Sequence, residues 1–166
     1  NQLIYILSYD SMADREKKFG AVLAEPKVRN ILEDRPTPTI RVVSTLMKPT
    51  DYSPEPKMRG EVHELRIYRA AAGKMSDLHN RFSNHTRGFF QKHGIEEVGY
   101  WTEEIGDNSL LVYILGYSSM AEREIRWGAF GADPDWQKVV AESHRDGVLS
   151  EVSWNTILRP TPYSPR

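Results

Sequence analysis

The stretch that decides the fold reads LVYILGYSSMAERE from Leu111 to Glu124, and the chain contains it twice. The first copy reads LIYILSYDSMADRE from Leu3 to Glu16, and residues 5–26 match residues 113–134 at more than half of their positions. The copies meet again at their ends, where KPTDYSP (48–54) corresponds to RPTPYSP (159–165). Two such blocks in the same order indicate an internal duplication, which must be recognised before a fold is assigned.

The second copy has the signals of a complete folding unit. Alternation predicts a strand over Val62–Tyr68, and Gly73 and Gly94 bracket a helix that ends at Lys92 and whose predicted inner face is Met75, Leu78, Phe82 and Phe89. Further strands are expected at 95–102, 110–117 and 152–158, and helices are expected after the caps at Ser119 and Asp133. The order strand, helix, strand, strand, helix, strand is the ferredoxin-like plan, an α+β fold.

The first copy has only part of this pattern. Gln2–Tyr9 is apolar on both faces and predicts a strand, Ser11 begins a helix, Glu25-Pro26 opens a second helix that Pro36 and Pro38 end, and Thr39–Met47 predicts another strand. This copy begins where the second has reached its third strand, so we expect the natural chain to run on upstream of Asn1. The Pro-rich segment 49–60 predicts a division into a partial first repeat, 1–59, and a complete second repeat, 60–166.

Helices are expected on one face of the sheet. The other face is predicted to carry Leu111, Tyr113, Leu115 and Tyr117, which are too apolar for contact with water. A second sheet must then cover this face. Two ferredoxin-like units that meet sheet to sheet form an α+β barrel, either within one chain or across a dimer.

The composition excludes several classes of function. The net charge is −1 with both signs interspersed, which argues against nucleic acid as the main partner. The chain has no cysteine, so disulfides and thiolate metal sites are excluded. No apolar run approaches the roughly 20 residues that span a bilayer. Signatures of hydrolases, kinases, zinc proteases and dinucleotide-binding proteins are also absent.

Several blocks in residues 60–166 resemble the NIPSNAP family. The blocks are VHELRIYRAAAGK (62–74), KHGI (92–95), VGYWT (98–102), DPDW (133–136) and PTPYSP (160–165), with Leu78, His79, Phe82, His85, Thr86 and Phe90 between them. The resemblance covers 60–166 as a whole unit and 3–54 as part of one, so the chain resembles a tandem repeat without the front of its first unit.

The resemblance implies a dimeric α+β barrel built from ferredoxin-like units, as a homo-oligomer or an intrachain pseudo-dimer. The barrel superfamily includes haem-degrading and quinone-forming monooxygenases, isomerases and dehydratases, while other members only bind. The family itself has no agreed activity to carry over, because a fold does not settle a function. No cofactor or metal is expected, with haem as the alternative. The expected location is cytoplasmic in a bacterium and mitochondrial in a eukaryote.

Two residues are candidates for catalysis. His85 falls on the predicted inner face of its helix with Phe82 and Phe89, where an imidazole serves as a general acid or base, an axial metal ligand, or a core histidine bonded to a strand. Arg66 shares a strand face with Glu64 and Tyr68. A buried arginine there holds a substrate carboxylate or pairs with Glu64.

An aromatic set on strands is the candidate ligand site. It comprises Tyr68, Trp101, Tyr113, Tyr117 and Trp154, which form either an apolar pocket with polar tips or simply core. Two hypotheses follow. The first is a protein that binds or transforms a small apolar molecule between helix and sheet, with monooxygenase-like or isomerase-like chemistry. The second is a non-enzymatic dimerisation or interaction module.

Overall fold

The structure is a computed structural model that describes residues 2–33, 42–106 and 108–164, without the side chains of 31–33 and 152. The chain divides into two compact units, Asn1–Val43 and Ser44–Arg166. No helix in the described ranges is both long and apolar enough to cross a bilayer.

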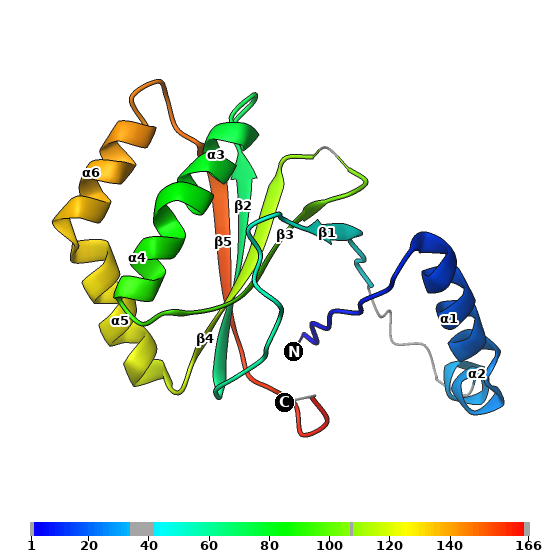
Figure 1. Cartoon of the computed structure of the whole chain (residues 1–166). Helices are drawn as coiled ribbons and strands as arrows, with labels where there is room; N and C mark the ends of the chain where they lie inside the picture. The colour runs from blue at the N-terminus through cyan, green and yellow to red at the C-terminus, as the bar shows by residue number, and fades with distance from the viewer. Residues whose placement is uncertain (1, 34–41, 107, 165–166) are drawn as a thin grey trace. The chain divides into compact units, whose positions relative to one another are not determined.

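The larger unit contains one antiparallel sheet with the strand order β1-β3-β4-β2-β5 (Figure 1). Its strands are β1 (Met47–Pro49), β2 (Val62–Ala70), β3 (Glu96–Glu103), β4 (Leu110–Tyr117) and β5 (Ser150–Leu158). Its helical segments are α3 (Met75–Arg81), η1 (Phe82–Thr86), α4 (Arg87–Lys92), α5 (Met120–Ala132) and α6 (Pro134–Ser143). From β2 to β5 the elements follow the predicted order strand, helix, strand, strand, helix, strand. The α+β class is confirmed, while assembly into a barrel stays a prediction.

Side-chain caps fix where the helices begin. The Ser119 hydroxyl accepts a hydrogen bond from the amide of Glu122 at 3.1 Å, and α5 starts at the next residue. Asp133 accepts from the amides of Asp135 and Trp136, and it both ends α5 and begins α6. An oxygen at this position satisfies amides that the first helical turn leaves without partners. The predicted helix starts at Ser119 and Asp133 are therefore confirmed.

The predicted helix 73–92 contains one turn of a different kind. The segment η1 is a π-helix between α3 and α4, so this turn holds one residue more than an α-helical turn. Beyond it Thr86 and Phe90 are buried and His85 is exposed, while Phe89 is half-buried and packs against the same cluster as Phe90. The extra residue thus explains why His85 does not face the sheet, whereas the predicted apolar residues Met75, Leu78, Phe82 and Phe89 all pack in or against the core cluster.

All four helices from α3 to α6 lie on one face of the sheet (Figure 1). The expectation that Leu111, Tyr113, Leu115 and Tyr117 face away from them is wrong, because these residues share one buried cluster with the helix residues Leu78, Phe82, Phe90 and Phe130. The reason for the error is that β4 is apolar on both faces, so its pattern does not reveal which face the helices cover. The face away from the helices carries a separate cluster of Val98, Trp101 and Ile114, with Met47 and Leu65 beside it.

The smaller unit, which contains the first copy of the duplicated sequence, forms the predicted helices but not the predicted strand at its start. Its helices α1 (Met12–Ala24) and α2 (Pro26–Glu33) begin where predicted, and Ser11 caps α1 as Ser119 caps α5. The predicted strand at residues 2–9 is absent, and Leu3 and Tyr5 are about 60% exposed. The equivalent residues of the second copy form β4 between β2 and β3. A strand needs neighbours to satisfy its amides and carbonyls, and none of the described residues of this unit supplies one.

The connector before β2 packs onto the larger unit. The amide of Thr50 donates to the carbonyl of Tyr100 at 3.0 Å, and the Tyr52 hydroxyl lies 2.7 Å from Nδ1 of His79. The compact units therefore divide between Val43 and Ser44, while the boundary of the repeats at 59/60 stays a prediction. Of the predicted strand 39–47, residues 39–41 lie outside the described residues, as do Pro36 and Pro38, and only Met47 belongs to a strand.

Gly60 holds the chain at the entrance to β2. Its φ is +83°, and a Cβ there would lie 2.3 Å from the carbonyl oxygen of Tyr117. Gly73 has a similar φ of +75°, but a Cβ there would meet nothing within 4 Å. The two positions share the backbone requirement and differ in the space around it.

We expect Gly73→Ala to lower the free energy of unfolding by about 1–2 kcal/mol, which is the cost of a left-handed alanine. Gly60→Ala should lower the free energy of unfolding by about 1–3 kcal/mol more than Gly73→Ala does, because its methyl group would overlap the backbone of β4. Urea unfolding followed by circular dichroism measures both. Equal losses in the two variants would contradict the close approach at Gly60.

Candidate functional site

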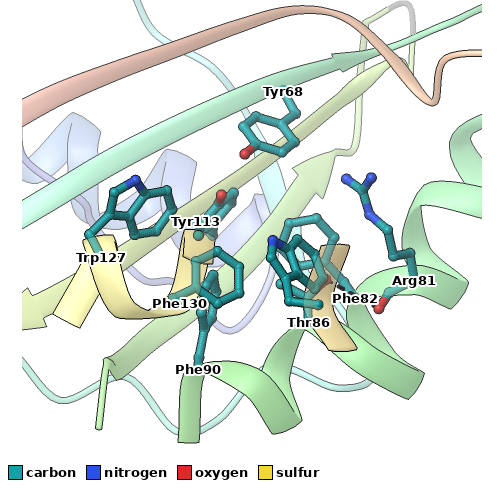
Figure 2. A pocket seen from close by; sticks show the side chains of 10 residues that line it. Tyr68, Arg81, Phe82, Thr86, Phe90, Tyr113, Trp127 and Phe130 are labelled. Atoms are coloured by element: carbon teal, nitrogen blue, oxygen red, sulfur yellow. Dashed lines mark hydrogen bonds between the residues drawn. The ribbon is translucent and has the colours of Figure 1, made fainter. Parts of the chain in front are cut away.

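A cavity of about 230 Å³ lies between the sheet and the helices of the larger unit, and we call it the helix–sheet cavity (Figure 2). It is lined by Tyr68, Arg81, Phe82, Thr86, Phe90, Tyr113, Trp127, Phe130, Gly131 and Trp136. Tyr68 and Tyr113 come from adjacent strands, β2 and β4, and the remaining residues come from the helical layer. Five of the ten are phenylalanine or tryptophan and a sixth is glycine, so most of the wall is apolar.

Sequence-local features place these wall residues. The π turn at η1 brings Thr86 and Phe90 inward, and the Thr86 hydroxyl donates to the carbonyl of Arg81 at 3.2 Å. The cap at Asp133 sets the turn between α5 and α6, which brings Phe130 and Trp136 together with ring centroids 4.6 Å apart. The wall therefore depends on one helix irregularity and one helix cap.

A buried ionic cluster lies beside the cavity. Glu64 is completely buried, and its carboxylate accepts from Arg66 at 2.6 Å, from Arg123 at 2.9 and 3.0 Å, and from Asn155 at 3.2 Å. The guanidinium of Arg66 stacks over the ring of Trp127, 4.3 Å from its centroid. Burial by itself raises the pKa of Glu64, but the bonds from Arg123 and Arg66 outweigh it and leave the pKa below its usual value. Glu64 is therefore ionised at neutral pH.

Arg66 connects this cluster to the floor of the cavity. Its Nε donates to the Tyr113 hydroxyl at 2.8 Å, and its Nη2 donates to the Tyr68 hydroxyl at 3.1 Å. Burial raises the pKa of Tyr113 well above its usual range, so this phenol stays protonated. Arg66 thus pairs with Glu64 and orients two phenols.

His85 lies elsewhere. The prediction that it faces the sheet is wrong, because it is exposed on the outer side of its helix, in a shallow hollow with Lys92 and Asp135. The π turn explains this, since it directs Thr86 inward at the next position. The structure therefore does not bring His85 together with Arg66.

The five aromatic residues predicted to form a ligand site on the strands do not lie together. Tyr68 and Tyr113 line the cavity, whereas Tyr117 is buried next to it with a hydroxyl that has no hydrogen-bond partner. Trp101 lies on the opposite face of the sheet, where its ring covers Gly99: a Cβ on Gly99 would lie 2.6 Å from it. Trp154 pairs with Ile67 on that same face and is 48% exposed.

Sequence reasoning missed most of the cavity wall. Trp127, Phe130 and Trp136 come from α5 and α6, which the sequence places near the sheet but without a register against it. Arg81 was missed because an arginine within a helix is usually on its solvent face. The sequence did contain a signal for Arg81: it follows Leu78 by three residues and directly precedes Phe82, so helical spacing places it next to the buried face.

The described residues offer neither a metal site nor room for haem. No group of three or more His, Asp or Glu side chains gathers among them where a metal ion could be held. Haem is implied only through the barrel superfamily. The cavity does not fit it, because about 230 Å³ accommodates a molecule near the size of a substituted benzene, and His85 lies outside.

Comparison with known proteins identifies the family. The model of the NIPSNAP family matches residues 1–54 and 63–165. The chain belongs to the NIPSNAP family. The predicted membership is confirmed, and residues 55–62 separate the two matched segments.

Relatives and solved structures agree with this NIPSNAP assignment. A NIPSNAP family protein with unknown function from Agrobacterium tumefaciens is 30% identical, with a TM-score of 0.57 over 67% of this chain and 97% of that one. A second NIPSNAP family protein from the same organism is 32% identical, with a TM-score of 0.57 over 63% and 96%. A NipSnap homolog from Dictyostelium discoideum is 26% identical over 151 residues, 86% of this chain. The match spans 63% of that relative's length.

We expect Glu64→Gln to lower the free energy of unfolding by about 3–5 kcal/mol, because it leaves two buried guanidinium groups without their carboxylate. The matched control is Glu124→Gln, which removes the exposed partner of Arg123 and should cost about 0–1 kcal/mol. Chemical denaturation of the two variants at neutral pH measures the difference. Similar small losses in both would show that Glu64 does not hold the cluster together.

Proposed function

We propose that this NIPSNAP protein binds a small, largely apolar molecule in the helix–sheet cavity. The observation that carries the proposal is a partly open, aromatic-walled space of about 230 Å³ between the sheet and the helices. Protein interiors contain few voids larger than a water molecule, and an apolar cavity of about 150 Å³ is enough to bind benzene. A space of this size and lining favours a ligand with one or two rings.

The lining supports binding more than chemistry. None of the ten residues that line the cavity is a carboxylate, histidine, lysine or cysteine, so the wall supplies no general base near neutral pH. The two phenols are donors and acceptors for orienting a ligand, and Arg66 holds them in place. The monooxygenase-like and isomerase-like chemistry expected through His85 has no support from its position.

We expect indole to bind the purified protein with a dissociation constant in the millimolar range or tighter, as measured by isothermal titration calorimetry. Thr86→Met should weaken this binding at least about tenfold, because it extends a buried wall residue into the cavity. The matched control is Ser83→Met, at an exposed position one turn earlier, which should bind indole like the wild type. Failure of indole and of similar neutral ring compounds to bind would contradict the proposal.

The uncovered face of the sheet favours a second candidate function, that of a dimerisation module. This face combines the cluster of Val98, Trp101 and Ile114 with the exposed ring of Trp154. Two twisted sheets can pack face to face, and their inner side chains then form a core about 10 Å thick. The commonest homo-oligomers are dimers with two-fold symmetry. A second copy of the same chain is the occupant that we propose for this face.

We expect the wild type to be a dimer and Trp154→Glu to be mostly monomeric in sedimentation velocity, because a buried unpaired carboxylate opposes association. The matched control is Ile125→Glu, which places the same acid at an exposed apolar position on α5 and should leave the dimer intact. A monomeric wild type would contradict this second candidate and leave ligand binding in the cavity unaffected.

A further inference from the structure

We propose that the helix–sheet cavity selects an anion, and that its ligand is a small aromatic or apolar carboxylate held by Arg81. This inference rests on the proposed function, since it assigns a chemical class to the ligand of the same cavity. It concerns a residue that neither the sequence pattern nor the ionic cluster around Glu64 explains.

Arg81 is a buried cation without an anionic partner. Its residue is 9% exposed, and it lines the cavity at the last position of α3. Its Nη1 lies 3.3 Å from Nε2 of His144 and 3.5 Å from the hydroxyl of Ser143, which are both neutral acceptors at long distance. Its Nε is buried and has no hydrogen-bond partner. No carboxylate among the described residues lies within ion-pair distance of it.

Three other arginines of the larger unit have carboxylate partners. Arg66 and Arg123 share Glu64, and Arg87 pairs with Glu97 at 2.8 Å. Burial of a charge without a counter-charge is costly, so buried arginines are normally paired. The guanidinium of Arg81, which has neutral partners at one nitrogen and no counter-charge, therefore marks the place where the charge of a ligand fits. Its planar fork of donors matches a carboxylate, which it can bind through two parallel hydrogen bonds.

The groups around Arg81 do not supply this charge. The phenols of Tyr68 and Tyr113 are the polar groups that the sheet contributes to the same cavity, and the Tyr113 phenol stays neutral because burial raises its pKa. Arg66 already holds both hydroxyls. The pKa of His144 is lowered by burial and by the charge of Arg81, so its ring is a neutral acceptor. Each neighbour is either neutral or already bonded.

The shape of the cavity defines the rest of the ligand. The guanidinium carbon of Arg81 lies 5.9 Å from the ring centroids of both Phe82 and Trp136. In Figure 2, Arg81 and Trp127 lie at opposite sides of the cavity, with Tyr113 and Phe130 between them. A carboxylate at Arg81 would direct an attached ring along this aromatic wall. About 230 Å³ leaves room for one such ring and its carboxylate.

The decisive experiment compares benzoate with benzamide, which have nearly the same shape and differ in charge. Isothermal titration calorimetry of the wild type should give a dissociation constant at least about tenfold lower for benzoate, because hydrogen bonds to charged groups are the stronger ones. Benzoate, and not benzamide, should also shift the Nε–H resonance of Arg81 strongly in an NMR titration. Acetate should bind at least about tenfold more weakly than benzoate, since it lacks the ring.

Arg81→Met should bring the two dissociation constants within about twofold of each other. Its Tm should equal or exceed that of the wild type, because the change removes an unpaired buried charge. The matched control is Arg145→Met, at an exposed arginine, which should keep the preference for benzoate. Arg81→Lys keeps a charge without the fork and should keep part of the preference, so it tests the same point if Arg81→Met does not fold.

Three outcomes would overturn the inference. Equal binding of benzoate and benzamide by the wild type would show that the cavity does not select an anion, and with indole still bound the proposed function would stand. A preference for benzoate that persists in Arg81→Met would assign it to another cation. Acetate that binds as tightly as benzoate would show that the ring contributes nothing.

Discussion

A carboxylate without any contact with solvent, Glu64, joins the sheet to the helical layer of the larger unit. It accepts bonds from arginines on two layers, Arg66 on the sheet and Arg123 on α5, so one buried charge connects helix and sheet. Arg66 then fixes the phenols of Tyr68 and Tyr113, and Trp127 of α5 lies against its guanidinium. Such a cluster is costly to bury unless each member is satisfied, which makes the arrangement specific.

The larger unit contains buried charges in two different environments. The cluster around Glu64 is neutralised and hydrogen-bonded internally, whereas Arg81 is desolvated and keeps free donors. Proteins tolerate local costs of this kind where function requires them, and the stability of the surrounding structure compensates. The satisfied cluster thus gives the rigid frame in which an unsatisfied group can be maintained.

The sequence predicted the elements of the complete repeat because its local signals were strong. β4 was predicted to the residue, and the caps at Ser119 and Asp133 located α5 and α6. It predicted the wrong face of β4 toward the helices, because an all-apolar strand has no alternation that distinguishes its two faces. It also assigned a strand to residues 2–9, although strand formation depends on neighbours that a local pattern does not report. Of the candidate site residues, the cavity includes Tyr68 and Tyr113, and Arg66 adjoins it.

The π turn also bears on the history of this family. A π turn is an α-helix with one residue inserted, so the inward positions of Thr86 and Phe90 arise from a change in length rather than in residue type. An alignment that places a single-residue gap within residues 82–86 would therefore separate relatives with a rotated helix from those that share this wall. Loss of one residue from this helical turn would rotate the wall residues that follow it, while the sheet and its ionic cluster stay unchanged.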